Sequence, residues 1–430
     1  MNGSDKALNE YLAAFKSEDN ALGNLLRNPD GREGIEHTPR EIAQQPLLWR
    51  RTAKMMRELA PSLTTFLEDA GLFARRNRPT IVLTGAGTSD YVGQSVSDLV
   101  RERFNTPVVS FATTRITASP ASFFAGDRER LMVHFARSGN SPESVAVLDI
   151  ALEHHRDRIR HVVITCNADG RLAQRAAENA DRVFLIVLDD ACNDRGLAMT
   201  SSFSDMVIAA QALAHLDDMD GFVRLIDRIA SAAEEFIRRH ADDIESIADV
   251  DVFRRAFFLG NGDLMGAASE AALKVQELTA GRLIAKSDDT LAFRHGPVSA
   301  VNGHTLVGFF LSADPYTRRY EIDVLNQYRG AFAALGARTL VFTACASDVS
   351  ANGDVILLTY DPDGQYDIPR LFQVNLAVLL GQMLALFASY KMGYNVDDPT
   401  ADSGLYARTV QGVQIYDFDP EPDVPASSNR

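Results

Sequence analysis

Cysteine is scarce in this sequence, with three residues in a chain of 430. Cys166, Cys192 and Cys345 are widely spaced and form no CxxC pair. This pattern argues against a disulfide framework and against a structural zinc site. We expect three reduced thiols.

Positive charge is also in short supply. The chain has 43 Lys and Arg against 58 Asp and Glu, which gives a formal charge of −15. Nucleic acids and anionic membranes are bound by basic surfaces, so we expect neither as a partner. An anionic substrate would have to be held by local donors.

Long hydrophobic runs are missing as well. The N-terminal residues MNGSDKALNEYLAAF contain no apolar core of the kind found in signal peptides. No run of about 18 apolar residues, the length needed to cross a bilayer, is found either. The expectation is a soluble, cytoplasmic protein.

What is present is a repeated α/β pattern. Apolar, strand-like segments alternate with helical patterns, which predicts a mostly parallel, doubly wound sheet flanked by helices. The expected strands begin at Ile81 and continue at Val108–Phe111, Leu131–Phe135, Val162–Thr165 and Val183–Leu188.

A second cycle starts at Ala256, about 175 residues after the first, and indicates an internal duplication. Its further strands are expected at 305–311, 339–342 and 355–358, followed by a long helix over 371–392. A chain of this length exceeds the ~250–300 residues that one core serves. We therefore predict a helical extension at 1–49, domains at 50–217 and 218–400, and at 401–430 an acidic, Pro-rich tail that is disordered or laid over the surface.

Two segments of the first half share one design. Ile81–Asp90 (IVLTGAGTSD) and Leu131–Ser144 (LMVHFARSGNSPES) each join an apolar strand to a Gly turn, hydroxyls and a helix start. Backbone N–H groups at a helix N-terminus bind anions, and the hydroxyls add donors. Simple capping of a helix, with Ser141 as the cap, is the alternative. Asp90 replaces the third Gly of a dinucleotide fingerprint, so we expect no NAD. We expect no other cofactor either.

Candidate catalytic side chains lie in the second half. Glu270, Lys274 and Glu277 fall on one face of a predicted helix within 266–281, although spacing alone favours a solvated Glu–Lys–Glu stripe. His295 stands in a Phe-Arg-His-Gly-Pro turn, where its ring is free to face a cleft. Thr200 stands at the start of another predicted helix, where capping is the simple explanation of its hydroxyl.

These motifs resemble those of a known family. GAGTS at 85–89 and ARSGNSPES at 136–144 are similar to the phosphate loops of the sugar isomerase (SIS) domain. ALKxxE at 272–277 followed by RHGP at 294–297 resembles the catalytic helix and His loop of hexosamine-phosphate isomerising SIS enzymes. From about Thr38 to Val413 the chain resembles the AgaS-type family of galactosamine-6-phosphate deaminases and tagatose-6-phosphate ketose/aldose isomerases, which implies two tandem SIS domains.

The resemblance also implies roles for individual residues. Glu277 would be the base that moves a proton between C1 and C2, Lys274 its charged neighbour, and His295 the acid/base that opens the ring. In related enzymes this His reaches the active site of the neighbouring subunit, so a homo-oligomer, a dimer, is expected. The substrate and phosphate ligands would come from Thr88, Ser89, Arg137, Ser138, Gly139, Asn140, Ser141, Thr200 and Glu270. No metal is implied.

The chain differs in two ways from glucosamine-6-phosphate synthase, a relative with an additional domain, and each difference excludes one kind of reaction. That enzyme has a glutaminase domain with a Cys nucleophile, whereas this chain has no Cys before Cys166. It also uses a C-terminal Lys as a Schiff base, where this chain has Arg408, a poor amine nucleophile. We therefore expect neither glutamine-driven amination nor a covalent sugar adduct.

The leading functional hypothesis is deaminating isomerisation of D-galactosamine 6-phosphate to D-tagatose 6-phosphate and ammonia. The alternatives are a plain aldose/ketose phosphate isomerase and a glucosamine-6-phosphate deaminase. A sugar-phosphate-sensing regulator is disfavoured, because the segment ahead of Arg50 lacks a basic recognition helix.

Overall fold

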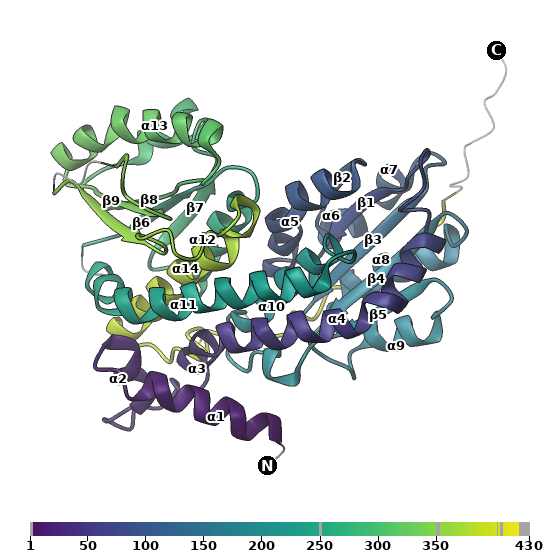
Figure 1. The fold of residues 1–430 in the computed structure, drawn as a ribbon, viewed down its shortest axis with the longest axis horizontal. Coiled ribbons are helices and arrows are strands. Elements are labelled where there is room, and N and C mark those ends of the chain that lie inside the picture. Colours follow the sequence, from purple (N-terminus) through teal and green to yellow (C-terminus); the bar gives the residue numbers. More distant parts are fainter. Residues whose placement is uncertain (1–2, 249–251, 350–352, 402, 405–406, 421–430) are drawn as a thin grey trace.

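The computed structural model describes residues 3–248, 252–349, 353–401, 403–404 and 407–420. Two five-stranded sheets lie side by side, with long helices between and around them (Figure 1). The predicted fold class, two α/β units with parallel sheets and an N-terminal helical stretch, is confirmed. The helices of that stretch are α1 (Gly3–Lys16), α2 (Ala21–Arg27) and α3 (Thr38–Ala43).

The first half supplies one sheet and its helices. Its elements are α4 (Gln45–Asp69), β1 (Thr80–Thr84), α5 (Thr88–Phe104), β2 (Val108–Ser110), α6 (Thr113–Ala118), α7 (Pro120–Phe124), β3 (Arg130–Ala136), α8 (Pro142–His154), β4 (Ile159–Thr165), α9 (Arg171–Glu178), β5 (Val183–Val187), η1 (Asp190–Cys192) and α10 (Ser201–Leu213).

The second half repeats the design. Its elements are α11 (Met219–Ile247), β6 (Arg255–Leu259), α12 (Leu264–Leu278), β7 (Ile284–Asp288), η2 (Ala292–His295), η3 (Pro297–Ala300), β8 (Thr305–Phe310), α13 (Pro315–Ala334), β9 (Arg338–Thr343), β10 (Val355–Thr359), η4 (Arg370–Phe372) and α14 (Val374–Lys391).

Both sheets are parallel and have equivalent strand orders. The first runs β2-β1-β3-β4-β5 and the second β10-β9-β8-β6-β7, which is the same order read from the opposite edge. In each sheet the first strand along the chain therefore lies between the second and the third. Ligands of doubly wound sheets bind at the carboxyl ends of the strands where the order reverses, here β1 and β3. The topology thus directs attention to the loops after Thr84 and Ala136.

One hydrophobic core joins the two halves. Alternating residues of β1 and β3, such as Leu83 and Val133, belong to the same buried cluster as Phe258 and Phe310 of the second sheet. Helices α4, α5, α10, α11, α12 and α14 fill the space between the facing sides of the two sheets. The outer face of the second sheet has a separate core formed with α13.

Helix α12 is held close to its neighbours by two glycines. A Cβ on Gly266 would lie 2.1 Å from Ser95 Oγ of α5, and one on Gly381 of α14 would lie 2.5 Å from Ala271 Cβ. The first approach fixes α12 against α5 of the first half, where the side chain of Lys274 reaches the start of α5, and the second fixes it against α14 of its own half. This placement brings Lys274 next to the loop after β1.

Three details differ from the sequence expectations. Strand β7 was missed, because its IAKSD sequence is polar and edge strands need only one partner. Helix α2 lies in the Gly-, Asn-, Pro- and Asp-rich part of residues 1–35, whose composition predicts a loop after a first helix, and Asn20 caps α2 by accepting a hydrogen bond from Gly23 N–H. The stretch Arg370–Lys391 is long and apolar enough, by length and composition, to cross a membrane, but 94% of its apolar 18-residue window is buried inside the fold.

The described part of the acidic tail, up to residue 420, forms no regular secondary structure. Phe418 packs against the cluster beneath α7 and α8, so this part does lie over the surface as expected. The expectation for residues 421–430 falls outside the described residues.

A buried pair of histidines predicts a pH dependence of stability. His134 Nε2 and His161 Nδ1, on the adjacent strands β3 and β4, lie 3.0 Å apart. Burial lowers the pKa of His134 to about 3 and holds the pKa of His161 well below its ordinary value. Below pH ~6.5 the two imidazoles therefore bind protons in the unfolded chain but remain neutral in the folded chain. As a result, the free energy of unfolding falls as the pH drops from 6.5 towards 4.

Urea unfolding across this pH range tests the effect. The double variant His134→Leu/His161→Leu should lose less free energy of unfolding between pH 6.5 and 4 than the wild type, by up to ~1.4 kcal/mol per pH unit for each histidine. Buried carboxyls such as Asp263, whose pKa burial raises to about 8, act in the opposite direction but are common to both proteins. If the free energy of unfolding changed equally with pH in the wild type and the double variant, the histidines would not be the cause of the loss of stability in acid.

Candidate active site

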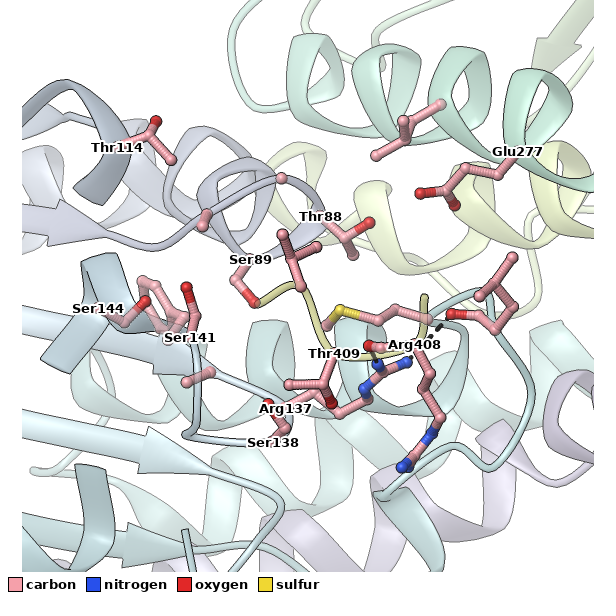
Figure 2. Close-up of a pocket in the computed structure, with 18 of the residues that line it drawn as sticks. Thr88, Ser89, Thr114, Arg137, Ser138, Ser141, Ser144, Glu277, Arg408 and Thr409 are labelled. Carbon is pink, nitrogen blue, oxygen red and sulfur yellow. Dashed lines mark hydrogen bonds between the residues drawn. The ribbon is translucent and has the colours of Figure 1, made fainter. Parts of the chain in front are cut away.

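A cavity of about 540 Å³ lies where the two halves meet. It is bounded by the two loops at the carboxyl ends of β1 and β3, by the last turns of α12 and by a C-terminal segment (Figure 2). Its lining includes Gly87, Thr88, Ser89, Thr114, Arg137, Ser138, Gly139, Ser141, Glu143, Ser144, Met199, Lys274, Glu277, Thr400, Arg408, Thr409 and Val410.

The first loop turns tightly into α5. Gly87 has φ +57°, a left-handed conformation that favours glycine, and a Cβ on Gly85 would lie 2.4 Å from the backbone oxygen of Ser89. These two glycines let the chain fold back so that Thr88 and Ser89 form the first turn of α5 at the cavity wall. The helix N-terminus and two hydroxyls therefore face the same space.

The second loop is built in a similar way before α8. Gly139 adopts φ +63°, and Ser138, Gly139 and Ser141 line the cavity. The Ser141 side chain does not cap α8; its hydroxyl instead donates to Glu143 Oε2 at 2.8 Å. The alternative of simple capping by Ser141 is therefore wrong. Figure 2 shows Ser89, Ser138 and Ser141 around one region of the cavity.

Asn140 has a different position from its neighbours. It does not line the cavity, and its side-chain oxygen accepts a hydrogen bond from Arg171 N–H at 3.0 Å. Asn140 thereby holds the second loop against the start of α9.

Arg137 lies buried beneath the loop and supports the C-terminal segment. Its Nη1 donates to the Leu197 carbonyl at 3.2 Å, and its Nη2 donates to the carbonyl of Arg408. The Arg408 side chain in turn donates to the backbone oxygens of Asn193 and Asp194. Arg137 therefore joins two walls of the cavity.

Three ionisable groups of α12 lie on the opposite side of the cavity, and two of them, Lys274 and Glu277, line it. Lys274 is buried, and its ammonium donates to Glu277 Oε2 and, at 3.0 Å, to Thr88 Oγ1. Glu270 Oε1 lies 3.4 Å from the same ammonium. Lys274 therefore connects α12 of the second half to the Gly-rich loop after β1 in the first half.

The two glutamates beside Lys274 differ in environment. Glu270 is fully buried and does not line the cavity; burial raises its pKa to about 7, Lys274 lowers it and Glu277 raises it further. Glu277 lines the cavity, and its carboxylate points into it from the end of α12 (Figure 2). The solvated Glu–Lys–Glu stripe that spacing alone allowed is thus wrong.

Two predicted site residues lie elsewhere in this chain. Thr200 is buried and outside the cavity lining; its hydroxyl and N–H both donate to the Asp194 carboxylate, which caps α10. The prediction of a sugar contact is therefore not supported by its position. His295 is exposed at the end of η2 and does not line the cavity of its own chain.

The site also contains residues that the sequence reasoning missed. Thr114 of α6 and Ser144 of α8 add hydroxyls, Glu143 adds a carboxylate, and Thr409 and Val410 come from the C-terminal segment. Glu143 could have been suspected, because it follows Ser141 by two residues. Thr409 and Val410 could have been suspected too, because they follow Arg408, which stands where glucosamine-6-phosphate synthase has its Schiff-base Lys.

The described residues contain no group of three or more His, Cys, Asp or Glu side chains arranged to hold a metal ion. The polar groups of the cavity are instead hydroxyls, helix N–H groups, the Lys274–Glu277 pair, the Glu143 carboxylate, and the guanidinium groups of Arg137 and Arg408, which donate to backbone carbonyls. Such donors suit an anion with hydroxyl groups.

Comparisons with known proteins agree with this geometry. Residues 75–216 match the SIS domain family. Over 381 residues, 88% of this chain and 95% of the relative, the sequence is 39% identical to an AgaS protein of Streptomyces coelicolor. It is 35% identical over 379 residues, again 88% and 95% of the two chains, to an Escherichia coli protein named D-galactosamine-6-phosphate deaminase AgaS.

A solved structure is similar as well. Tagatose-6-phosphate ketose/aldose isomerase from Escherichia coli superposes with a TM-score of 0.77 and 33% identity, covering 89% of this chain and 96% of that one. The similarity at this level of identity covers 88–89% of this chain. The chain therefore belongs to the AgaS family of SIS-domain proteins.

Proposed function

We propose that this protein converts D-galactosamine 6-phosphate into D-tagatose 6-phosphate and ammonia. The observation that carries the proposal is the position of the Glu277 carboxylate, which comes from the second half and enters a cavity whose other walls are the hydroxyl-rich loops of the first half. The names of the AgaS relatives supply the substrate class.

In this proposal the phosphate is held by neutral donors. Ser89, Ser138 and Ser141 donate hydroxyl groups, and the N-termini of α5 and α8 supply partial positive charge. Neutral donors suit a protein whose formal charge is −15. Arg137 and Asn140 act by keeping the loop in place, as their hydrogen bonds indicate.

Glu277 performs the proton transfer. Once the sugar ring is open, the carboxylate removes the proton from C2 and delivers it to C1. The amine at C2 then becomes a ketimine, which water hydrolyses to the ketose and ammonia. The ammonium of Lys274 lies beside Glu277 and stabilises the negative charge that develops on the sugar oxygen.

His295 opens the ring, acting from a neighbouring subunit. Its exposure and its absence from the cavity of its own chain support this assignment. The apolar side chains of Ile284 and Leu291, which are 58% and 37% exposed in the same region of the chain, would be covered by such a partner. We propose a homodimer in the cytoplasm as the active form.

An ammonia-release assay tests the proposed reaction. With galactosamine 6-phosphate as substrate, ammonia and tagatose 6-phosphate should form in equal amounts, and glucosamine 6-phosphate should react more slowly. Incubation with tagatose 6-phosphate alone is the isomerase control. Production of an aldose phosphate from that control, with no ammonia from either amino sugar, would favour the plain isomerase instead.

The phosphate loops predict a selective loss of binding. Ser138→Ala with Ser141→Ala removes two donors to the phosphate, and each lost charge-assisted hydrogen bond costs about 1.5–3 kcal/mol. KM for the phosphorylated sugar should therefore rise roughly 100-fold or more, with a much smaller change in kcat. Steady-state kinetics with phosphorylated and free galactosamine provide the measurement. If both substrates were affected equally, these serines would not bind the phosphate.

A subunit-mixing experiment tests the shared site. Glu277→Gln and His295→Asn should each be inactive alone. A hybrid dimer contains one site with both wild-type residues if His295 acts across the interface, so mixed subunits should recover up to about a quarter of wild-type activity. Activity that stays at background after verified subunit exchange would place both residues in the same chain's site.

A further inference from the structure

A second cleft of about 390 Å³ lies at the edge of the first sheet, beside β2 and the short helix α7. Its walls carry three arginines, Arg115, Arg128 and Arg130, and the hydroxyls of Ser119 and Ser122. We refer to it as the arginine cleft. It shares no lining residue with the cavity that contains Glu277.

The positive charge of the arginine cleft is uncompensated. Within the described part of the chain, none of its three arginines has a carboxylate oxygen within 4.0 Å. The nearby Asp127 pairs at 2.6 Å with Arg158 instead. Burial lowers the pKa of Arg130, and the charges of Arg158 and Arg128 lower it further.

Carboxylates farther away do not fill this role. Asp90 interacts with Arg115 only through its longer-range field, and Glu129 forms no ion pair among the described residues. The mutual repulsion of three guanidinium groups is therefore left in place. In a chain of net charge −15, such a concentration of unpaired arginines is unusual.

Two of the guanidinium groups are held in position by aromatic rings. Arg115 lies over the Phe111 ring at 4.3 Å from its centroid, and Arg130 lies over Phe123 at 5.7 Å. Arg130 also donates to the carbonyls of Phe123 and Ala125 at 3.2 and 3.1 Å. Fixed guanidiniums lose less side-chain entropy when a ligand binds.

We propose that the arginine cleft is a second binding site, which takes a phosphate-bearing small molecule. Guanidinium donors match phosphate oxygens in a forked geometry, and the neighbouring serine hydroxyls add neutral donors. The shared chemistry is a phosphate monoester or a pyrophosphate group. Its possible sources are free phosphate, a hexose 6-phosphate and a nucleoside diphosphate.

One helix connects the cleft to the catalytic cavity. Thr114 of α6 lines the cavity, whereas the next residue, Arg115, lines the cleft. The preceding residue, Thr113, donates its N–H to the Gly85 carbonyl in the first phosphate loop at 2.8 Å. The two sites are thus adjacent but separable by substitution.

Isothermal titration calorimetry on the full-length protein tests the proposal. The titrants are inorganic phosphate, galactitol 6-phosphate as an unreactive hexose phosphate analogue, and ADP. The wild type should bind its best titrant at two sites per chain. Ser138→Ala/Ser141→Ala should lose one site, which leaves the arginine cleft visible alone.

In that double variant, Arg115→Gln and Arg128→Gln should each weaken the remaining site by roughly tenfold or more. Arg319→Gln, on α13 in the second half, is the matched control for loss of one exposed positive charge and should leave binding unchanged. Arg130 is not substituted, because its hydrogen bonds hold the loop before β3. The tightest titrant identifies the source of the phosphate.

Two results would overturn the proposal. The first is a single site per chain whose affinity for all three titrants is insensitive to Arg115 and Arg128. The second is a change in sedimentation of the oligomer on substitution of either arginine, which would make the cleft a contact between subunits. Neither result bears on the ammonia-release assay, so the proposed reaction and this site fail independently.

Discussion

Glu277→Gln should abolish turnover while leaving substrate binding nearly intact. The substitution keeps the size of the side chain and its ability to accept a hydrogen bond from Lys274, but an amide cannot take a proton from C2. Positioned general bases contribute about 10²–10⁴-fold to rate, so kcat should fall by at least that range. The affinity for the substrate, measured by calorimetry, should change by less than about threefold.

Isotope exchange makes the test specific to the proton-transfer step. In D₂O the wild type should catalyse exchange of a C1 proton of tagatose 6-phosphate for solvent deuterium. The Glu277→Gln variant should not catalyse this exchange. Glu270→Gln is the matched control, because this carboxyl lies on the same helix but outside the cavity lining. Exchange that persists in Glu277→Gln would remove this residue from the role of base.

The largest effect on stability is expected from Lys274→Met. Lys274 is buried between Glu270 and Glu277, and methionine preserves its apolar stem but removes its charge. Removing one partner of a buried ion pair leaves the other charge without compensation and costs about 3–5 kcal/mol. The free energy of unfolding at pH 7.5, measured with urea, should fall by that amount.

The double variant Lys274→Met/Glu270→Gln provides the control. If the loss comes from the uncompensated Glu270 carboxylate, neutralising it should restore a large part of the stability but none of the activity. The single variant should also be less destabilised at pH 5.5 than at pH 7.5, because a protonated Glu270 carries no charge; its pKa, already raised to about 7 by burial, rises further without Lys274. Equal losses at both pH values would point to packing rather than charge.

The parts of the site that the sequence predicted are those in which one short motif determines the conformation. The Gly turns at Gly87 and Gly139 place their hydroxyls locally, so both phosphate loops were found with most of their cavity-lining residues. The same holds for α12, since helical spacing alone places Lys274 and Glu277 on one face. The assignment of specific roles rested on the family resemblance.

The parts that escaped prediction depend on tertiary contacts. Thr200 was assigned to the sugar by the family resemblance, and its local sequence could not correct this, because a hydroxyl at a helix start has the same pattern whether it binds a ligand or Asp194. Residues 38–41, Thr-Pro-Arg-Glu, likewise match a capping box at the start of α3, but the N–H groups of residues 36–38 bind the Asp397 carboxylate from the other end of the chain. No local pattern encodes a partner 360 residues away.

The C-terminal wall of the cavity has a consequence for biosynthesis. Arg408 is anchored to the carbonyls of Asn193 and Asp194, and Thr409 and Val410 close the cavity beside loops that were made more than 260 residues earlier. Translation therefore releases both phosphate loops and α12 long before the last wall exists. A nascent chain that ended before residue 408 would contain both loops and α12 but would lack the residues that form the last wall of the cavity.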